Sequence, residues 1–137
     1  SLKEELKTVE DYLALEKVRY EERLQIKWDI QPETLAVQVA PMMLQTLVEN
    51  AIKHGVQKAI GWGFIEIHTK KMDDFLNIKI RNTGNLKSIE NTRIDGGFGL
   101  QNTEKRLKLI YGNQATFRIF QEIDNQVVTA EINIPIK

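Results

Sequence analysis

The stretch PMMLQTLVENAIKHG, residues Pro41–Gly55, is the most informative part of this chain. Asn50, Lys53 and His54 share one face of the helix that it predicts, because residues three and four apart are neighbours on a helix. Glycine is common just past a helix end, so Gly55 predicts where this helix ends. The opposite, core-facing stripe is apolar and consists of Met43, Leu44, Leu47, Val48 and Ile52.

The polar end of this helix has two interpretations. With the preceding carboxylate of Glu49, it brings an amide and two cationic side chains together, which suits the binding of a charged ligand. Alternatively, Lys53 and His54 cap the last carbonyl groups of the helix, and Gly55 only terminates it. Spacing alone favours neither interpretation.

A second helix is predicted to begin in the glycine-rich stretch GGFGLQN, residues Gly96–Asn102. Its apolar markers are Leu100, Leu107, Ile110 and Tyr111. Glycines before a helix let backbone amides approach an anion, and the helix N-terminus adds roughly half a positive charge. This is the outline of a phosphate cradle, although glycines also serve ordinary turns.

Taken in order, these residues resemble the ATP-binding catalytic domain of sensor histidine kinases, in the GHKL ATPase superfamily, and more closely its LytS-like branch. Pro41–Gly55 is similar to the N box of that family, and Gly97–Asn102 with Arg106–Leu107 is similar to its second glycine box. Leu6–Arg23 resembles the helix and linker that precede the domain, and Ile132–Pro135 resembles its end. The resemblance therefore covers nearly the whole chain.

The resemblance implies a site for ATP and magnesium. Asn50 would hold the magnesium ion that bridges the phosphates, and an amide oxygen suits a hard cation that also keeps phosphate oxygens and waters. Glu49 would polarise the attacking histidine, and Lys53 and His54 would face the phosphates. The implied catalytic residues are Glu49, Asn50, Lys53 and His54. The implied nucleotide-binding residues are Asn50, Lys53, His54, Asn82, Gly84, Gly97, Gly99, Leu100 and Asn102.

One departure from the family pattern concerns the adenine. The first glycine box of the family reads Asp-x-Gly-x-Gly after a strand, and its Asp accepts the adenine amino group. This chain has Asn82–Leu86, NTGNL, after a strand predicted over Leu76–Arg81. The amide oxygen of Asn82 can still accept, but it lacks a charge, which corresponds to about 1–2 kcal/mol. Returning Asn82 to Asp is therefore expected to tighten ATP binding. Thr46 and Val128–Thr129 also depart from the family pattern.

Composition sets the broad class of the protein. The 137 residues suit one domain. Without cysteine or a secretory leader, we expect a reducing cytoplasmic setting, such as the cytoplasmic part of a membrane-bound sensor. No apolar run is long enough to span a membrane, so none of this chain is expected to contact one. The 19 Lys and Arg residues balance the 19 Asp and Glu residues, which argues against nucleic-acid binding.

The N-terminal part predicts a linker helix over residues 1–23, before an ATP-binding domain over 24–137. Leu2, Leu6, Val9 and Leu13 alternate steps of four and three, as in the seam of a paired helix. The helix either docks on its own domain or pairs through an upstream region. By the resemblance, that region carries the phosphoacceptor histidine and dimerises the full-length protein, and a response regulator is a further partner.

Alternating strands and flanking helices predict an α/β two-layer sandwich with a mixed sheet covered on one face. This agrees with the Bergerat-type fold that the resemblance implies. The next helix is predicted over Gly99–Ile110, and the aperiodic stretch Asn82–Gly97 is predicted to be a lid over the nucleotide. The open face of the sheet is expected to be wet, with Glu66, Lys70 and Lys79 on it. The predicted strands are Leu24–Ile30, Val37–Ala40, Phe64–Thr69, Phe75–Ile80, Ala115–Gln121 and Gln126–Ile136.

Four other side chains have both a structural and a functional interpretation. His68 lies in an alternating strand and is predicted to be a solvated sheet residue, not a phosphoacceptor. Arg106 could reach a phosphate or remain a surface charge. Trp28 and Trp62 are predicted to pack against the protein rather than stack on a nucleotide.

Three functions follow from these observations. The first is a kinase module that transfers the terminal phosphoryl group of ATP to a histidine on an upstream domain. Asn82 motivates the second, a nucleotide-binding regulatory module with weakened or lost kinase activity. The third, a dimerisation module without a ligand, rests on the first helix.

Overall fold

The computed structural model describes residues 1–56, 62–84, 98–122 and 126–136, with residues 98–102 described by their backbone alone. The described strands form one mixed sheet in the order β1-β2-β3-β5-β4, in which only the β1–β2 pair is parallel. The strands are β1 (Leu24–Ile30), β2 (Gly63–Met72), β3 (Phe75–Thr83), β4 (Thr116–Glu122) and β5 (Val127–Pro135).

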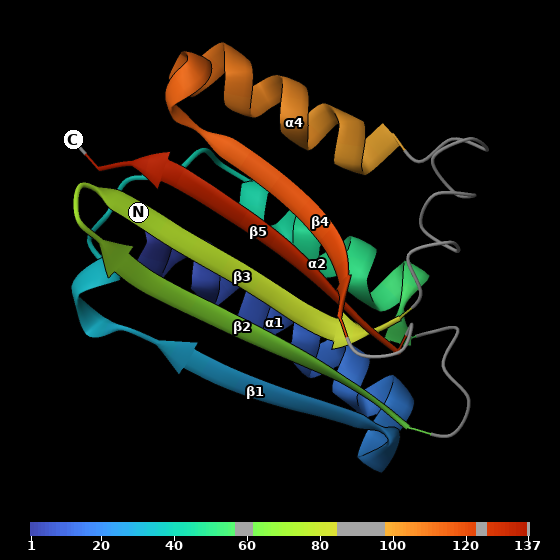
Figure 1. Cartoon of the computed structure of the whole chain (residues 1–137). Helices are drawn as coiled ribbons and strands as arrows, with labels where there is room; N and C mark the ends of the chain where they lie inside the picture. Colours follow the sequence, from blue (N-terminus) through green and yellow to red (C-terminus); the bar gives the residue numbers. More distant parts are fainter. Residues whose placement is uncertain (57–61, 85–97, 123–125, 137) are drawn as a thin grey trace.

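Helices cover one face of this sheet. Figure 1 shows α1 (Leu2–Tyr20) and α2 (Met43–His54) behind the strands, and α4 (Phe98–Tyr111) alongside β4. The helix α2 packs against both α1 and α4. The predicted two-layer α/β sandwich is therefore confirmed. None of the helices in the described part of the chain combines the length and the apolar content needed to cross a membrane.

Two predicted strand assignments are wrong. Residues 37–40 form no strand, because the carbonyl groups of Val37 and Leu35 instead accept hydrogen bonds from the first N–H groups of α1, at 2.8 and 3.0 Å. Those N–H groups have no partner within their own helix. Asn82 and Thr83 belong to β3 rather than to a loop, because they pair with β5. Gly84, also in the predicted lid, directly follows β3, and residues 85–97 lie outside the described residues.

The helix α1 docks on its own domain. Its four seam residues are at most 6% exposed and belong to the main hydrophobic core, so the seam is not available to a second helix. At its start, Ser1 and Glu4 form a capping box. The buried seam residues are Leu2, Leu6, Val9 and Leu13.

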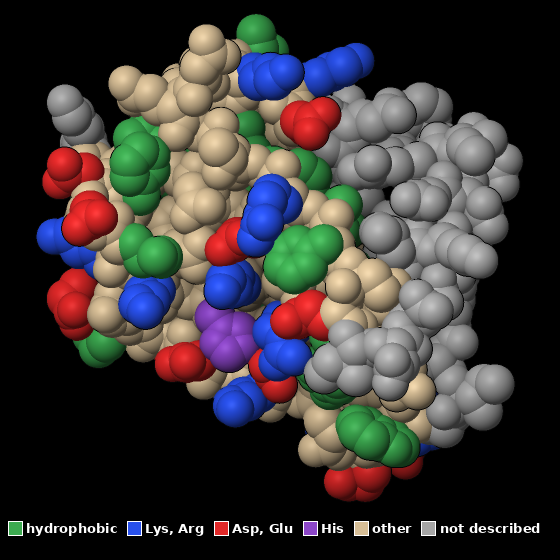
Figure 2. Space-filling model, in the orientation of Figure 1, with side chains coloured by type: hydrophobic (Ala, Val, Ile, Leu, Met, Phe, Trp, Pro, Cys, Tyr) green, Lys and Arg blue, Asp and Glu red, His purple; other side chains and the backbone are tan. Residues whose placement is uncertain are grey.

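The open face of the sheet is polar, as predicted, and carries mixed charges (Figure 2). Arg81 donates to Glu66 at 2.7 Å and to Glu122 at 2.8 Å. Hydrogen bonds from Arg81 and Thr129 lower the pKa of the Glu122 carboxyl below its ordinary value. Ordered ion pairs therefore hold the charged side chains of this face in place.

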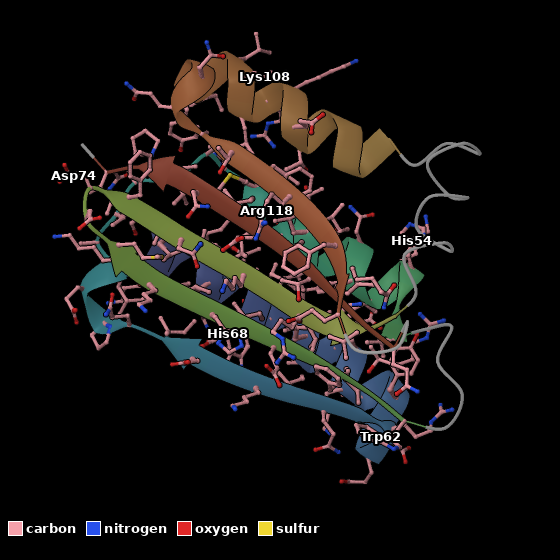
Figure 3. The ribbon with its side chains drawn as sticks, viewed as in Figure 1. His54, Trp62, His68, Asp74, Lys108 and Arg118 are labelled. Carbon is pink, nitrogen blue, oxygen red and sulfur yellow. The ribbon has the colours of Figure 1, made fainter. Side chains whose placement is uncertain are left out.

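His68 lies on this same face (Figure 3), with ring nitrogens 3.3 Å from Asp29 and 3.0 Å from Glu66. It is a sheet residue, as predicted. The prediction that the tryptophans pack against the protein holds for Trp28, which is 37% exposed, but not for Trp62, which is 63% exposed. Trp62 directly precedes the first paired residue of β2, so no strand pairing holds its backbone against the protein.

Candidate functional site

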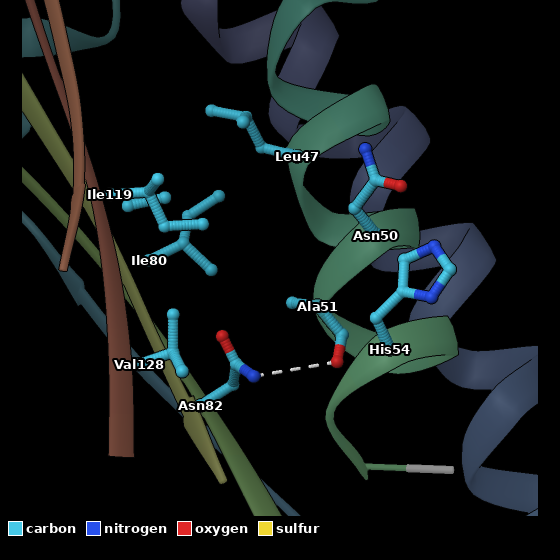
Figure 4. Close-up of a pocket in the computed structure, with 9 residues that line it drawn as sticks. Leu47, Asn50, Ala51, His54, Ile80, Asn82, Ile119 and Val128 are labelled. Atoms are coloured by element: carbon cyan, nitrogen blue, oxygen red, sulfur yellow. Dashed lines mark hydrogen bonds between the residues drawn. The ribbon is translucent and has the colours of Figure 1, made fainter. Parts of the chain in front are cut away.

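A small cavity lies between the last turns of α2 and the sheet (Figure 4). Its open space is about 20 Å³, enough for about one water molecule. The walls are mostly apolar, and three polar residues are among those that line it: Asn50, His54 and Asn82. The full lining is Leu47, Asn50, Ala51, His54, Ile80, Asn82, Ile119, Val128 and Ala130.

Residues at helical spacing and residues at strand spacing both line this cavity. From α2 come residues 47, 50, 51 and 54, whose spacing of three and four places them on one helix face. From β3 come Ile80 and Asn82, and from β5 come Val128 and Ala130. Each strand pair is two residues apart, and such residues point to the same side of a sheet.

Two glycines let the end of α2 approach β3 closely. Gly55 ends the helix, and its N–H donates to the carbonyl oxygen of Ala51 at 3.0 Å. A Cβ atom on Gly55 would lie less than 3.0 Å from Asn82 Nδ2, from Thr83 O and from Ala51 O. A Cβ atom on Gly84 would lie 3.3 Å from the Cα atom of Gly55. The backbone contact therefore requires Gly55.

Asn82 is 3% exposed, and its amide has a defined orientation. Nδ2 donates to the carbonyl oxygen of Thr83 at 2.9 Å and to that of Ala51 at 3.5 Å. The side-chain oxygen then points into the space between α2 and the sheet (Figure 4). It can accept a hydrogen bond from an amino group of a ligand.

This orientation adds an expected loss of stability to the effect of Asn82→Asp on ATP binding. A carboxylate has no hydrogen to donate, so one of its oxygens would face the carbonyl groups of Thr83 and Ala51. We expect the free energy of unfolding to fall by about 2–3 kcal/mol, because the two hydrogen bonds of the amide are lost and the buried carboxylate faces carbonyl oxygens instead of donors. Urea unfolding would measure this loss.

The matched control is Asn113→Asp, which makes the same change of charge at an exposed residue. We expect it to leave the urea midpoint almost unchanged. A midpoint for Asn82→Asp equal to that of the wild-type protein would contradict the assigned orientation of the amide.

The predicted site residues separate into two groups. Asn50, His54 and Asn82 meet at the cavity, with Gly84 beside Asn82. Lys53 does not line the cavity with Asn50 and His54: at about 100° per residue it lies about 60° from Asn50 and about 100° from His54, on the side of α2 that faces α1. His54 is 8% exposed, whereas Lys53 is exposed.

Glu49 and Lys53 line a different hollow, of about 270 Å³, between α1 and α2. Burial raises the pKa of the Tyr12 hydroxyl in this hollow, and the negative charges of Glu16 and Glu49 act in the same direction. The hollow is lined by Tyr12, Glu16, Arg19, Tyr20, Glu49, Ile52 and Lys53.

The glycine-box residues lie at the start of α4. Gly99, Leu100 and Asn102 fall in its first turns, where the backbone alone is described. Gly97 lies outside the described residues.

Arg106, further along α4, is half-buried and donates to the carbonyl oxygen of Pro41 at 2.6 Å. Neither interpretation of Arg106 from the sequence included this contact. A backbone carbonyl 65 residues away leaves no sequence signal.

The chain matches no model of a protein family. It is similar to curated sensor histidine kinases over most of its length. It is 33% identical to sensor histidine kinase YpdA of Escherichia coli over 118 residues, which cover 81% of this chain and 21% of that protein. It is 32% identical to sensor protein LytS of Staphylococcus saprophyticus over 145 residues, which cover 98% of this chain and 24% of that protein. The chain thus spans about a quarter or less of these relatives.

Solved structures of histidine kinases share its fold. The catalytic domain of histidine kinase ThkA superposes with a TM-score of 0.69 at 18% identity, covering 96% of this chain and 92% of that domain. Histidine kinase AdeS of Acinetobacter baumannii superposes with a TM-score of 0.65 at 16% identity, covering 97% of this chain and 66% of that structure.

Proposed function

We propose that this chain, a homologue of LytS-type sensor histidine kinases with the fold of their catalytic domains, binds ATP and magnesium and transfers the terminal phosphoryl group to a histidine. The observation that carries the proposal is the convergence of Asn50, His54 and Asn82 on one cavity between α2 and the sheet. The acceptor histidine would lie on an upstream domain, and a response regulator would receive the phosphoryl group in turn. In this scheme the full-length protein is a homodimer and the reaction takes place in the cytoplasm.

The inner part of the cavity suits the amino edge of adenine. Ile80, Val128 and Leu47 provide apolar surface for a purine, and the oxygen of Asn82 would accept from its amino group. The cavity as it stands is much smaller than the roughly 300 Å³ at which ligand pockets begin. Binding would therefore require α2 and the sheet to separate around the ring.

The outer part suits phosphates and a hard cation. The side chains of Asn50 and His54 project from neighbouring turns of α2 (Figure 4). Oxygen ligands are what magnesium prefers, so the amide oxygen of Asn50 fits the role that the resemblance implies. When bound, the ion would neutralise charge on the phosphates during transfer. Gly97, Gly99, Leu100 and Asn102 would let the start of α4 approach the phosphates.

Glu49 and Lys53 would act from the neighbouring face of α2. We propose that Glu49 polarises the incoming histidine from the hollow beside α1, where it lies next to Tyr12 and Glu16. Lys53 is exposed on a long flexible stem, by which it could reach a phosphate from that side. Residues 1–23 would be the linker from the upstream domain, although α1 packs into the same core.

A second candidate function is a nucleotide-binding regulatory module with little or no transfer. It is favoured by one observation, that Asn82 provides a neutral oxygen where the family has a carboxylate. The third function, a dimerisation module without a ligand, is less favoured, because the apolar seam of α1 on which it was based is buried against its own domain.

Calorimetry with a non-hydrolysable ATP analogue tests the proposal. We expect a dissociation constant below about 1 mM in the presence of magnesium, which corresponds to a binding free energy of at least about 4 kcal/mol. Removal of the metal with EDTA is expected to weaken it. No binding at millimolar analogue would contradict both nucleotide-binding functions. ATP-dependent phosphorylation of a histidine in the longer parent protein would then separate a kinase from a regulatory module.

A further inference from the structure

The first turn of α2 has no cap from its own sequence. Met42 occupies the N-cap position, and its apolar side chain cannot accept from the free N–H groups there. Its backbone is also left-handed, with φ of 64°, a conformation that residues other than glycine rarely adopt. The N–H of Met43 donates to the nearby carbonyl oxygen of Ala40 at 3.4 Å, and the rest of this turn depends on contacts from elsewhere in the fold.

Glu5 of α1 supplies the missing cap. One carboxylate oxygen, Oε2, accepts from the N–H of Met42 at 3.1 Å, and the other, Oε1, accepts from the N–H of Gln45 at 3.2 Å. Both oxygens are thus used on backbone groups of another helix. The negative charge also lies at the N-terminus of α2, where the helix dipole favours it.

Arg106 of α4 holds the same turn from its other side. Its Nη2 atom donates to the carbonyl oxygen of Pro41, the residue directly before Met42. Figure 1 shows α1 and α2 behind the strands and α4 alongside β4, and α2 contacts both other helices. Charged side chains from two helices therefore fix the backbone at the start of the third.

We propose that Glu5 and Arg106 are positioning residues that set the place of α2, and with it the cavity, relative to α1 and α4. The inference rests on the proposed function. A helix moves as a rigid element, and Asn50 and His54 lie about 12 to 18 Å along the axis from Met42 at about 1.5 Å per residue. A shift of α1 is thus transmitted through the Glu5 carboxylate to the residues that line the nucleotide cavity.

Glu5→Gln tests this coupling, because the amide keeps the size of the side chain but places an NH2 group against a backbone N–H. In the nucleotide-free chain, we expect faster hydrogen exchange at the amides of Met42 and Gln45, and shifted NMR signals at Asn50 and His54. We also expect about fivefold weaker binding of the magnesium–ATP analogue, at a temperature where the variant is fully folded.

Two further variants separate positioning from general stability. Glu10→Gln removes the same charge from an exposed position of α1 and is expected to change none of these measurements. Met42→Gly in the Glu5→Gln background is expected to restore both the signals and the affinity, since glycine adopts the left-handed turn without a clamp.

Unchanged NMR signals at Asn50 and His54 in Glu5→Gln would overturn the inference, whether or not nucleotide binds. Shifted signals without any binding by the wild-type chain would instead contradict the proposed function alone. If the wild-type chain binds the magnesium–ATP analogue and Glu5→Gln binds it with equal affinity, the inference would also be overturned.

Discussion

Gly55→Ala is expected to lower the free energy of unfolding by about 3 kcal/mol, because the added methyl group has no space. The new Cβ atom would lie less than 3.0 Å from two backbone oxygens, those of Thr83 and Ala51. It would also displace Nδ2 of Asn82, which is buried and hydrogen-bonded to those same oxygens. Two of these contacts are to backbone oxygens and the third is to a buried, hydrogen-bonded amide, so rotation of a flexible side chain cannot relieve the clash.

The matched control for this change is Gly112→Ala. Gly112 has φ of 65°, and nothing lies within 4 Å of a Cβ atom there, so alanine would meet backbone strain alone. We expect a loss of about 1 kcal/mol for this control. Urea unfolding of both variants would check the order, and a loss for Gly55→Ala no larger than that for Gly112→Ala would show that α2 and β3 do not approach as described.

Asn50→Ala is expected to abolish magnesium-dependent nucleotide binding while the fold survives. Asn50 is half-buried at the cavity and lies outside the main hydrophobic core, so its removal should cost little stability. If its oxygen holds the cation, the affinity in magnesium should fall by about 100-fold or more, equivalent to about 3 kcal/mol. Calorimetry with the ATP analogue, with magnesium and with EDTA, would measure the difference.

Two variants serve as controls for Asn50→Ala. Gln45→Ala removes a side-chain amide from the same helix at a position that does not line the cavity, and we expect it to bind as the wild-type chain does. Asn50→Asp keeps an oxygen ligand and is expected to retain magnesium dependence. Magnesium-dependent affinity in Asn50→Ala equal to that of the wild-type chain would refute the assigned role.

Much of the fold could be predicted because it is encoded in local periodicity. The helix that ends at Gly55, the bounds of β1 and the hairpin of β2 and β3 all follow from spacings of 3.6 or 2 residues. The burial of the α1 seam agrees with one of the two interpretations left open by its pattern. The resemblance to LytS-like histidine kinases is confirmed by homologues over most of the chain and by the shared fold.

The failures occurred where a partner from another element decided the local structure. Residues 37–40 alternate like a strand, but their backbone satisfies the start of α1. Asn82 and Thr83 have loop-like composition, yet β5 extends far enough to pair with both. Lys53 shares a helical spacing with Asn50 but turns toward the hollow beside α1.

For this protein, sequence patterns predict most of the elements, the family and the short list of polar residues that could bind a nucleotide. The three-dimensional arrangement was needed to establish which of them meet, how the Asn82 amide is oriented, and that Glu5 and Arg106 hold the start of α2. The sequence does not reveal the contacts of Asn82, Glu5 and Arg106 because their partners are backbone groups. Periodicity is a property of neighbouring residues, whereas these contacts are made to backbone N–H and C=O groups, which every position carries and which no residue type reveals.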